Sequence, residues 1–181
     1  MRIVSGIARG KQLCTPQGLD VRPTIDRVKE AVFSSLQFDI EGRNILDLFA
    51  GSGQLGLEAI SRGAKECNFV DGSENSIKCI NENIKACGFV DKCVVNHCDS
   101  FNFLKNTDLK FDIAFLDPPY DKGMIDKAMP ELVLKMSDAG IIVCEHTEND
   151  ALQESYGKFE KYKTKKYGKV YVTFYRKSEV W

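Results

Sequence analysis

From residue 44 onward, short runs of apolar residues alternate with longer segments in which apolar positions recur every three or four residues. The short runs predict buried strands, and the longer segments predict amphipathic helices. This alternation is typical of an α/β protein, in which a parallel sheet is covered by helices. We expect strands at residues 44–49, 67–71, 93–96, 112–116 and 140–145, and helices at residues 54–62, 74–87, 99–105 and 122–137.

The N-terminal residues depart from this pattern. They predict a short hairpin formed by Arg2–Ser5 and Lys11–Thr15, followed by a helix that begins at Thr24, with Thr24 as its cap. The apolar residues of that helix recur at helical spacing and should face the core: Ile25, Val28, Val32 and Leu36.

The C-terminal residues also depart from it. Residues 158–166 and 169–177 flank the turn Tyr167-Gly168, and apolar residues alternate with polar ones in the second segment. This predicts an antiparallel hairpin that closes one edge of the sheet. We therefore expect a single domain spanning residues 1–181, in which residues 1–38 form an N-terminal extension.

The composition indicates a globular protein with one core and without a membrane-spanning stretch. A chain of 181 residues with 43% hydrophobic content can bury one core, and it contains no stretch of about 20 apolar residues that would cross a membrane. The N-terminus shows no apolar signal-peptide segment. We expect a cytoplasmic monomer with no membrane partner.

The cysteines argue against both disulfides and metal. Their number, seven, is odd and no C-x-x-C pair occurs, so we expect reduced and mostly buried thiols. Cys93, His97 and Cys98 lie close in sequence, but neighbours on a strand point to opposite faces. We therefore expect no metal site.

The net charge of −1 conceals a segregation along the chain. Residues 1–36 carry +3, residues 158–181 carry +6 and residues 37–157 carry −10. Basic flanks on an acidic middle fit a protein whose additions bind a polyanion, although solvated faces would give the same pattern.

A glycine-rich turn follows the strand predicted at residues 44–49. The segment Ala50-Gly51-Ser52-Gly53-Gln54-Leu55-Gly56 contains G-x-G-x-x-G between a strand and a helix, which favours a nucleoside-bearing cofactor. The first two glycines let backbone amides approach a ligand, and Gly56 lets the helix pack closely on the sheet. Asp71 closes the next predicted strand, where its carboxylate can accept both hydroxyls of an adenosine ribose.

The motif alone does not separate a nicotinamide dinucleotide from S-adenosylmethionine. Asp47 favours the latter, because a carboxylate there repels a pyrophosphate but holds the ammonium end of a methionine moiety. Asp99, just past the third strand, is placed to accept from an adenine N6 amine or to cap the following helix. The candidate cofactor residues are Asp47, Ala50, Gly51, Gly53, Asp71, Asp99 and Ser100.

The segment Asp117-Pro118-Pro119-Tyr120 directly follows the apolar run at residues 113–116. Two prolines end the strand, so an acid, a rigid backbone and an aromatic ring stand together at the carboxyl edge of the sheet. If the Asp117 carboxylate and the Pro118 carbonyl both accept from an exocyclic amine, its lone pair is drawn out of the ring and aimed at a methyl donor. Tyr120 would stack on a base that is flipped out or unpaired.

With both motifs in place, the chain resembles class I S-adenosylmethionine-dependent methyltransferases, with their Rossmann-like sheet. More narrowly, it resembles the bacterial family that methylates guanine N2 in 16S ribosomal RNA. The closer resemblance rests on the segments at residues 22–33, 47–53, 55–59 and 115–120 and covers nearly the whole chain. The family more often has Glu where Asp71 stands and a small residue where Gln54 stands.

The resemblance implies S-adenosylmethionine as cofactor, cofactor contacts at Asp47, Gly51, Gly53, Asp71 and Asp99, and base contacts at Asp117, Pro118, Pro119 and Tyr120. It implies 16S rRNA or the assembling 30S subunit as partner, bound through the N-terminal extension. The candidate RNA contacts there are Arg9, Lys11, Arg22 and Arg27, and near the C-terminus they are Lys163, Lys165 and Lys166. Arg27 could instead pair with Asp26 or Glu30.

Three other functions share part of this pattern. Methylation of adenine N6 uses the same Asp-Pro-Pro-Tyr chemistry, although sequence-specific DNA enzymes usually carry a further recognition domain. A nicotinamide-dependent oxidoreductase transfers hydride, and that chemistry does not require Asp-Pro-Pro-Tyr. A non-catalytic RNA-binding protein would have no reason to keep Asp117 and the glycines.

Overall fold

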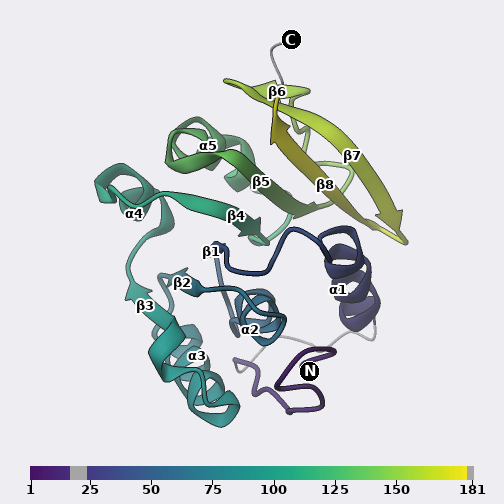
Figure 1. Cartoon of the computed structure of the whole chain (residues 1–181). Helices are drawn as coiled ribbons and strands as arrows, with labels where there is room; N and C mark the ends of the chain where they lie inside the picture. Colours follow the sequence, from purple (N-terminus) through teal and green to yellow (C-terminus); the bar gives the residue numbers. More distant parts are fainter. Residues whose placement is uncertain (17–23, 179–181) are drawn as a thin grey trace.

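The computed structural model describes residues 1–16 and 24–178, with residues 24 and 25 described by their backbone only. Within this part of the chain, eight strands form one sheet in the order β3-β2-β1-β4-β5-β8-β7-β6 (Figure 1). The strands are β1 (Asn44–Leu48), β2 (Glu66–Asp71), β3 (Cys93–His97), β4 (Phe111–Leu116), β5 (Met136–His146), β6 (Ser155–Tyr156), β7 (Phe159–Tyr167) and β8 (Val170–Lys177).

The first five strands are parallel, whereas β8 runs antiparallel to β5 and continues the sheet into β7. The predicted α/β class, its parallel sheet and its antiparallel C-terminal hairpin are therefore confirmed. The short strand β6, which pairs with the start of β7, has no counterpart in the prediction.

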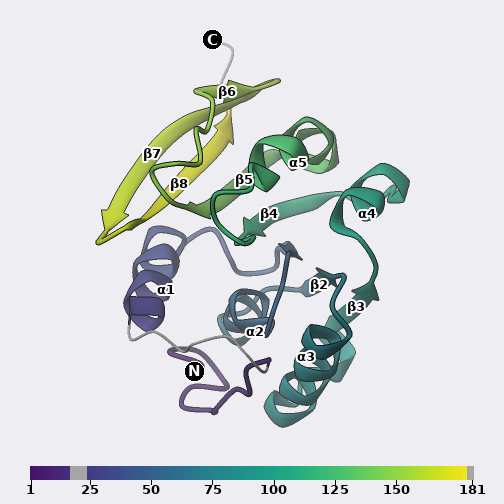
Figure 2. The ribbon, with the colours of Figure 1, turned by 180° about the vertical axis from the view of Figure 1, so that it is seen from behind.

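Helices cover both faces of the sheet, as the front and back views show (Figures 1 and 2). On one face, α1 (Thr24–Ser35), α2 (Gln54–Ser61) and α3 (Glu74–Cys87) share a core with Ile45, Phe69 and Phe115. On the other face, α4 (Ser100–Asn106) and α5 (Met124–Leu132) pack on Leu46, Val70 and Leu116. We call these the α1 face and the α5 face.

Three predicted elements differ from the structure, and one of them is the strand predicted at residues 140–145, because β5 begins at Met136. The predicted helix at residues 122–137 is wrong at its C-terminal end, because α5 stops at Leu132 and a single 3-10 turn, η2 (Val133–Lys135), leads into β5 at Met136. In the predicted N-terminal hairpin, pairing is limited to one bridge between Arg2 and Gln12, supported by backbone hydrogen bonds between Ile3 and Lys11 and between Gly10 and Ile3. A second 3-10 turn, η1 (Val90–Lys92), precedes β3.

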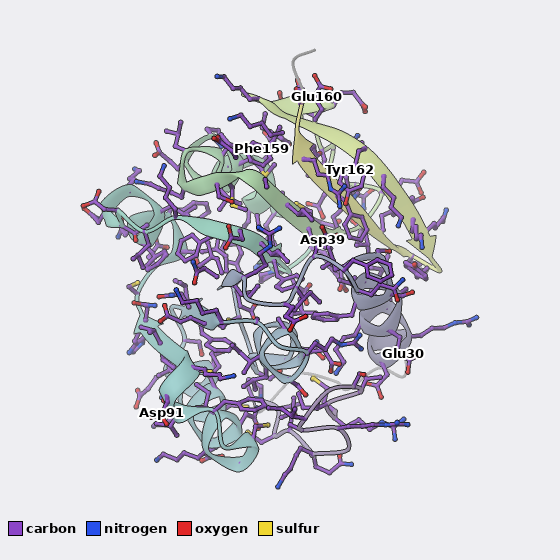
Figure 3. The ribbon with its side chains drawn as sticks, in the orientation of Figure 1. Glu30, Asp39, Asp91, Phe159, Glu160 and Tyr162 are labelled. Carbon is purple, nitrogen blue, oxygen red and sulfur yellow. The ribbon has the colours of Figure 1, made fainter. Side chains whose placement is uncertain are left out.

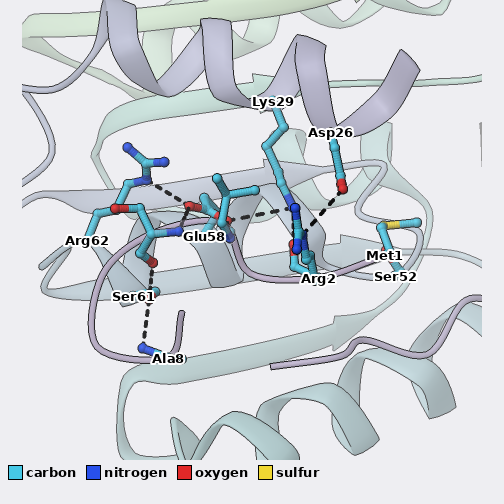
Figure 4. Close-up of polar contacts among 12 residues, drawn as sticks. Met1, Arg2, Ala8, Asp26, Lys29, Ser52, Glu58, Ser61 and Arg62 are labelled. Carbon is cyan, nitrogen blue, oxygen red and sulfur yellow. Dashed lines mark hydrogen bonds and ion pairs between the residues drawn. The ribbon is translucent and has the colours of Figure 1, made fainter. Parts of the chain in front are cut away.

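The N-terminal hairpin is fastened to the sheet domain by a buried carboxylate. Glu58, on α2, is fully buried and accepts hydrogen bonds from the backbone N–H groups of Val4 and Ser5 at 2.8 and 3.0 Å. Its other partners are Arg62 at 2.8 Å and the buried Lys29 ammonium at 3.7 Å (Figure 4). The hairpin also contributes Ile3, Ala8 and Leu13 to the core, so it packs as part of the same hydrophobic cluster.

The cysteines are free thiols of varied exposure. Cys67, Cys79 and Cys144 are buried, whereas Cys14 is exposed, so the expectation of mostly buried thiols holds only in part. Cys14 and Cys79 lie 2.7 Å apart at their sulfur atoms and share a hydrogen bond. The contact ties the end of the hairpin to α3.

Candidate functional site

The candidate cofactor and base residues lie at the carboxyl ends of neighbouring strands. Asp47 is the fourth residue of β1, Asp71 ends β2, and Asp117 directly follows β4. Because β2, β1 and β4 are adjacent and parallel, their carboxyl ends form one edge of the sheet, the edge at which α/β proteins bind ligands. The structure thus brings the two predicted motifs together.

The glycine-rich turn crosses this edge in a backbone conformation that depends on its glycines. Gly51 and Gly53 have φ angles of 58° and 75°, in the region that favours glycine. Phe49 also has a positive φ, 63°, which is rare for an aromatic residue and is typical of sites where the fold holds strain for function. The turn is thus held in an unusual shape beside the carboxylates.

Asp47 lies under the start of α2 and is almost fully buried, at 2% exposure. Its Oδ2 accepts a hydrogen bond from the backbone N–H of Gly56 at 2.9 Å. Burial raises the pKa of this carboxyl to about 8, and the nearby charge of Asp71 adds to the shift. Such a carboxyl gains from a positively charged ligand.

Asp71 holds the glycine-rich turn against β2. Its Oδ2 accepts from the backbone N–H of Gly51 and its Oδ1 from that of Ser73, at 2.9 and 2.8 Å. A carboxylate can accept about four hydrogen bonds, so these two contacts leave capacity for ribose hydroxyls.

Asp99 and Ser100 open α4. The side chain of Asp99 accepts from the backbone N–H of Asn102 at 2.9 Å and caps the helix, as one of its two expected roles required. Ser100 is buried, whereas Asp99 is exposed at the same edge of the sheet. Phe101, the next residue, packs edge-on against Phe49 with ring centroids 6.0 Å apart, so the turn and the start of α4 are in contact.

The Asp-Pro-Pro-Tyr segment leaves β4 as an irregular loop. Asp117 is half-buried and Pro118 buried, whereas Pro119 is exposed. Burial raises the pKa of Asp117 well above its usual value, and the charges of Glu145 and Asp47 raise it further. Tyr120 directs its hydroxyl to Oε1 of Glu145 at 2.6 Å.

Glu145 was not among the residues predicted from the sequence, yet it stands beside them. The parallel register pairs Leu116 of β4 with Cys144 of β5, so Asp117 and Glu145 are the next residues on the two strands. Phe115 and Val143, two positions earlier, belong to the α1 face, and the alternation of side chains places both acids on that face. In the sequence, Glu145 is marked only by its position at the end of the apolar run at residues 141–144.

The predicted RNA contacts fall into three groups. Arg9 and Lys11 are exposed in the N-terminal hairpin, and Arg27 is exposed on α1, where Asp26 pairs with Arg2 at 3.8 Å. Within the described residues no ion pair of Arg27 with Asp26 or Glu30 is found. Arg22, like the side chains of Thr24 and Ile25, lies outside the described part of the chain.

The lysines of β7 form the third group, and the structure divides them. Lys165 and Glu145 both pair with Val172, so Lys165 lies on the α1 face, level with Glu145 and two strands, or about 10 Å, away. Lys163 shares that face and donates to Ser35 at the end of α1 at 2.9 Å. Lys166 lies on the α5 face, with its ammonium over the ring of Tyr171.

An exposed aromatic residue stands next to these lysines. Tyr162, bulged out of β7, lies beneath the Arg176 guanidinium, which is 4.6 Å from the ring centroid and pairs with Asp39 at 3.2 Å. Tyr162 and Asp39 are labelled in Figure 3. Tyr162 is 42% exposed, so the α1 face of this hairpin presents both cationic and aromatic groups.

Neither a metal centre nor a membrane segment is found where the structure is described. In residues 1–16 and 24–178, no group of three or more His, Cys, Asp or Glu side chains could hold a metal ion. Among the same residues, no helix has both the length and the apolarity needed to cross a membrane.

Solved proteins share this fold over nearly the whole chain. An Escherichia coli structure provisionally titled as the methyltransferase yhhF superposes with a TM-score of 0.89 and 29% identity over 98% of both chains. A Haemophilus influenzae structure provisionally titled as the methylase HI0767 gives a TM-score of 0.82 and 30% identity, again over 98% of both chains. The fold is therefore that of the class I, Rossmann-like methyltransferases.

Sequence comparison identifies the family within this class. The model of the family described as "Conserved hypothetical protein 95" matches residues 1–176, and the chain belongs to that family. A Bacillus subtilis relative, provisionally named rRNA methyltransferase YlbH, is 35% identical over 183 residues, covering 98% of this chain and 99% of the relative. Ribosomal RNA small subunit methyltransferase D of Haemophilus influenzae is 37% identical over 133 residues, covering 71% and 68%.

Proposed function

We propose that the protein transfers a methyl group from S-adenosylmethionine to the exocyclic N2 amine of a guanine in 16S ribosomal RNA. The observation that carries this proposal is the placement of Asp117 at the end of β4, one strand away from Asp47 at the end of β1. An acceptor for an amine and a carboxylate suited to a cationic cofactor therefore lie side by side. The names of the relatives, which act on small-subunit rRNA, support this substrate.

The donor set at the turn fits S-adenosylmethionine. Asp47 is buried and forms no ion pair with any of the described residues, so it suits the ammonium end of the methionine moiety. Gly51 and Gly53 leave two positions of the turn without side chains, Ala50 lies between them and β1, and Asp71 retains acceptor capacity for the ribose. Asp99 and Ser100, at the start of α4, would border the adenine. When bound, the cofactor supplies a methyl group on a positively charged sulfur.

The catalytic work falls to the loop after β4. An exocyclic amine is a poor nucleophile because its lone pair is delocalised into the ring. Asp117 and the Pro118 carbonyl, as two acceptors, draw the amine hydrogens aside and direct the lone pair outward. The raised pKa of Asp117 also suits it to receive the proton lost from the amine, although water can serve after transfer. Pro119 stiffens the loop, and Tyr120 offers a ring on which the base stacks.

The RNA is held by basic residues around the α1 face and the extension. Lys163 and Lys165 lie on β7, which runs towards the catalytic edge, our name for the carboxyl ends of β2, β1 and β4 with Asp71, Asp47 and Asp117. Arg9, Lys11 and Arg27 lie in residues 1–38. We place Arg22 and Lys166 in the same role, with Lys166 approaching from the α5 face. We propose that the chain acts in the cytoplasm as a monomer, as one domain whose first 38 residues assist RNA binding.

The variant that tests this mechanism is Asp117→Asn, which keeps one acceptor but removes the charge. We expect methyl transfer to fall by at least about 100-fold, because the amine loses its anionic acceptor. Affinity for S-adenosylmethionine, measured by calorimetry, should change by less than about threefold, since Asp117 acts on the amine. Turnover equal to that of the unmodified protein would sink the mechanism, whereas loss of cofactor binding would assign Asp117 to the cofactor.

A further inference from the structure

Glu145 lies at the catalytic edge, and the mechanism above gives it no task. It is half-buried, it lies next to Asp117 on the same face, and its charge is felt by Asp117. Burying a carboxylate is costly, so a second acid beside Asp117 needs a compensating partner. Within the described residues its hydrogen-bond donor is Tyr120, which contacts Oε1.

The hydrogen bond from Tyr120 indicates that Glu145 acts as a hydrogen-bond acceptor. The hydroxyl donates to Oε1, so Glu145 is engaged as an acceptor. Burial raises the pKa of Glu145, and the hydrogen bond from Tyr120 opposes part of that increase because it stabilises the carboxylate. A side chain held in this way has its second oxygen, Oε2, left to accept from a ligand, and the pairing of β4 with β5 places Glu145 close to Asp117.

Two adjacent hydrogen-bond acceptors match the edge of guanine better than the edge of adenine. Guanine presents hydrogen-bond donors at both N1 and N2, whereas adenine presents a donor at N6 and an acceptor at N1. A flipped or unpaired base is read along this edge. If Asp117 and Pro118 accept from N2, the atom next along the edge of guanine is the N1–H. In adenine the same position holds a lone pair, which an ionised carboxylate repels.

We propose that Glu145 accepts a hydrogen bond from guanine N1–H and thereby selects guanine over purines whose N1 is an acceptor, with Tyr120 holding its carboxylate in place. This inference rests on the proposed function and names the residue that determines its base specificity. Asp-Pro-Pro-Tyr serves either amine, so the discrimination is assigned to the neighbouring strand β5.

The test uses a base that separates the two contacts. 2-Aminopurine has the N2 amine of guanine but an acceptor at N1. After the methylated nucleotide has been mapped on unmodified small-subunit RNA, that position is replaced by 2-aminopurine through splinted ligation. We expect the unmodified protein to methylate guanine at least about 100-fold more efficiently in kcat/KM than 2-aminopurine, because the acceptor pair is left facing a lone pair.

The variant Glu145→Gln then decides the role of the carboxylate. Its amide can accept from N1–H or donate to an N1 lone pair, so the guanine to 2-aminopurine ratio should fall to within about tenfold. The control Glu148→Gln removes an exposed acid three residues further on and should keep the original ratio. Calorimetric affinity for S-adenosylmethionine reports whether each variant is folded.

Two results overturn the inference without touching the proposed function. One is equal methylation of guanine and 2-aminopurine by the unmodified protein, which needs no variant to fold. The other is an unchanged ratio in a Glu145→Gln protein that binds cofactor normally, which would leave Glu145 as a support for Tyr120 alone. Absence of methyl transfer to guanine in the mapping step would instead contradict the proposed function itself.

Discussion

At the scale of single residues, the catalytic edge is dominated by acids whose charges the protein leaves largely uncompensated. Asp47, Asp117 and Glu145 all have raised pKa values, and burial is the main cause in each case. Such a cluster weakens the ligand-free fold and is neutralised when a cation or a hydrogen-bond donor binds. These raised pKa values are consistent with the cationic cofactor and the amine that we propose for the site.

Asp47 gives a pH-dependent prediction. Its pKa is about 8 in the fold and near 3.8 unfolded, so the folded state binds the extra proton and stability falls as pH rises between these values. Asp47→Asn keeps an acceptor for Gly56 but cannot ionise. Between pH 5 and pH 8 the variant should lose less stability than the unmodified protein, by up to about 4 kcal/mol.

Urea denaturation of the ligand-free protein at both pH values measures this difference. Asp47→Asn should also bind S-adenosylmethionine more weakly at pH 8, because a charge opposite the ammonium is missing. Parallel pH profiles for the two proteins would show that Asp47 is ionised throughout the range and would contradict the account of its burial.

The sequence predicts some of these residues and not others, for a physical reason. Asp47, Asp71 and Asp117 each adjoin a local signal, a glycine turn or a proline pair, that marks the end of a strand. Glu145 has no such neighbour. Its proposed role depends on the register in which β5 pairs with β4, which brings Glu145 beside Asp117, and neither segment alone specifies how the two strands pair.

At the scale of elements, the packing of α2 against β2 depends on Gly56. A Cβ atom at this position would lie 2.4 Å from Cε1 of Phe69 and 2.5 Å from Sγ of Cys67. Gly56→Ala should therefore destabilise the protein by about 1–3 kcal/mol, the usual cost of overpacking a core. Gly72→Ala is the control, because its Cβ would meet only a carbonyl oxygen at 3.8 Å.

Thermal unfolding of these two variants separates packing from backbone effects. The Gly72 variant should unfold close to the unmodified protein and the Gly56 variant several degrees lower. If both unfold at the same temperature, the close approach of α2 to the sheet does not limit stability.

The attachment of the N-terminal hairpin gives a second prediction at this scale. Glu58→Gln would leave the buried Lys29 ammonium without its anion, a change that costs about 3 kcal/mol when a buried pair is broken. The backbone N–H groups of Val4 and Ser5 should then exchange with solvent faster than in the unmodified protein. Unchanged exchange at these two amides would show that the apolar contacts of the hairpin suffice to hold it.

Element boundaries were predictable where composition changes sharply, and α3 matches its predicted range of 74–87. The end of α5 was not. Leu132, Val133 and Met136 continue a helical spacing, so the sequence favours a longer helix, but Met136 pairs with Phe111 and starts β5. Tertiary pairing therefore overrides a local pattern at this boundary, a frequent cause of errors in predicted element ends.

At the scale of the whole molecule, the basic and acidic segments of the sequence occupy different parts of the structure. The basic C-terminal segment is the β7–β8 hairpin, whose α1 face carries Lys163 and Lys165 towards the catalytic edge. The acidic middle contains the carboxylates that we propose hold the cofactor and the base, among them Asp47 and Asp117. The RNA phosphates would thus contact the lysines, and only the amine of the target base would contact the carboxylates.

Replacing Lys163 and Lys165 together by Ala should weaken binding to small-subunit RNA and reduce the slope of log affinity against log salt by about 1–2. The control replaces Lys85 and Lys92, two exposed lysines of the acidic middle, and should change neither quantity. Filter binding between 50 and 200 mM salt, a range over which phosphate contacts weaken steeply, supplies the slopes. Identical slopes for both pairs would mean that the β7 lysines are only a solvated edge.

The most direct test of the central claim is the identity of the methylated nucleoside. The protein is incubated with labelled S-adenosylmethionine and undermethylated small-subunit particles or naked 16S RNA, and the RNA is digested to nucleosides. The account predicts label in N2-methylguanosine. Label in N6-methyladenosine would keep the fold and the role of Asp117 but contradict the guanine assignment, and no transfer to any nucleic acid would contradict the account as a whole.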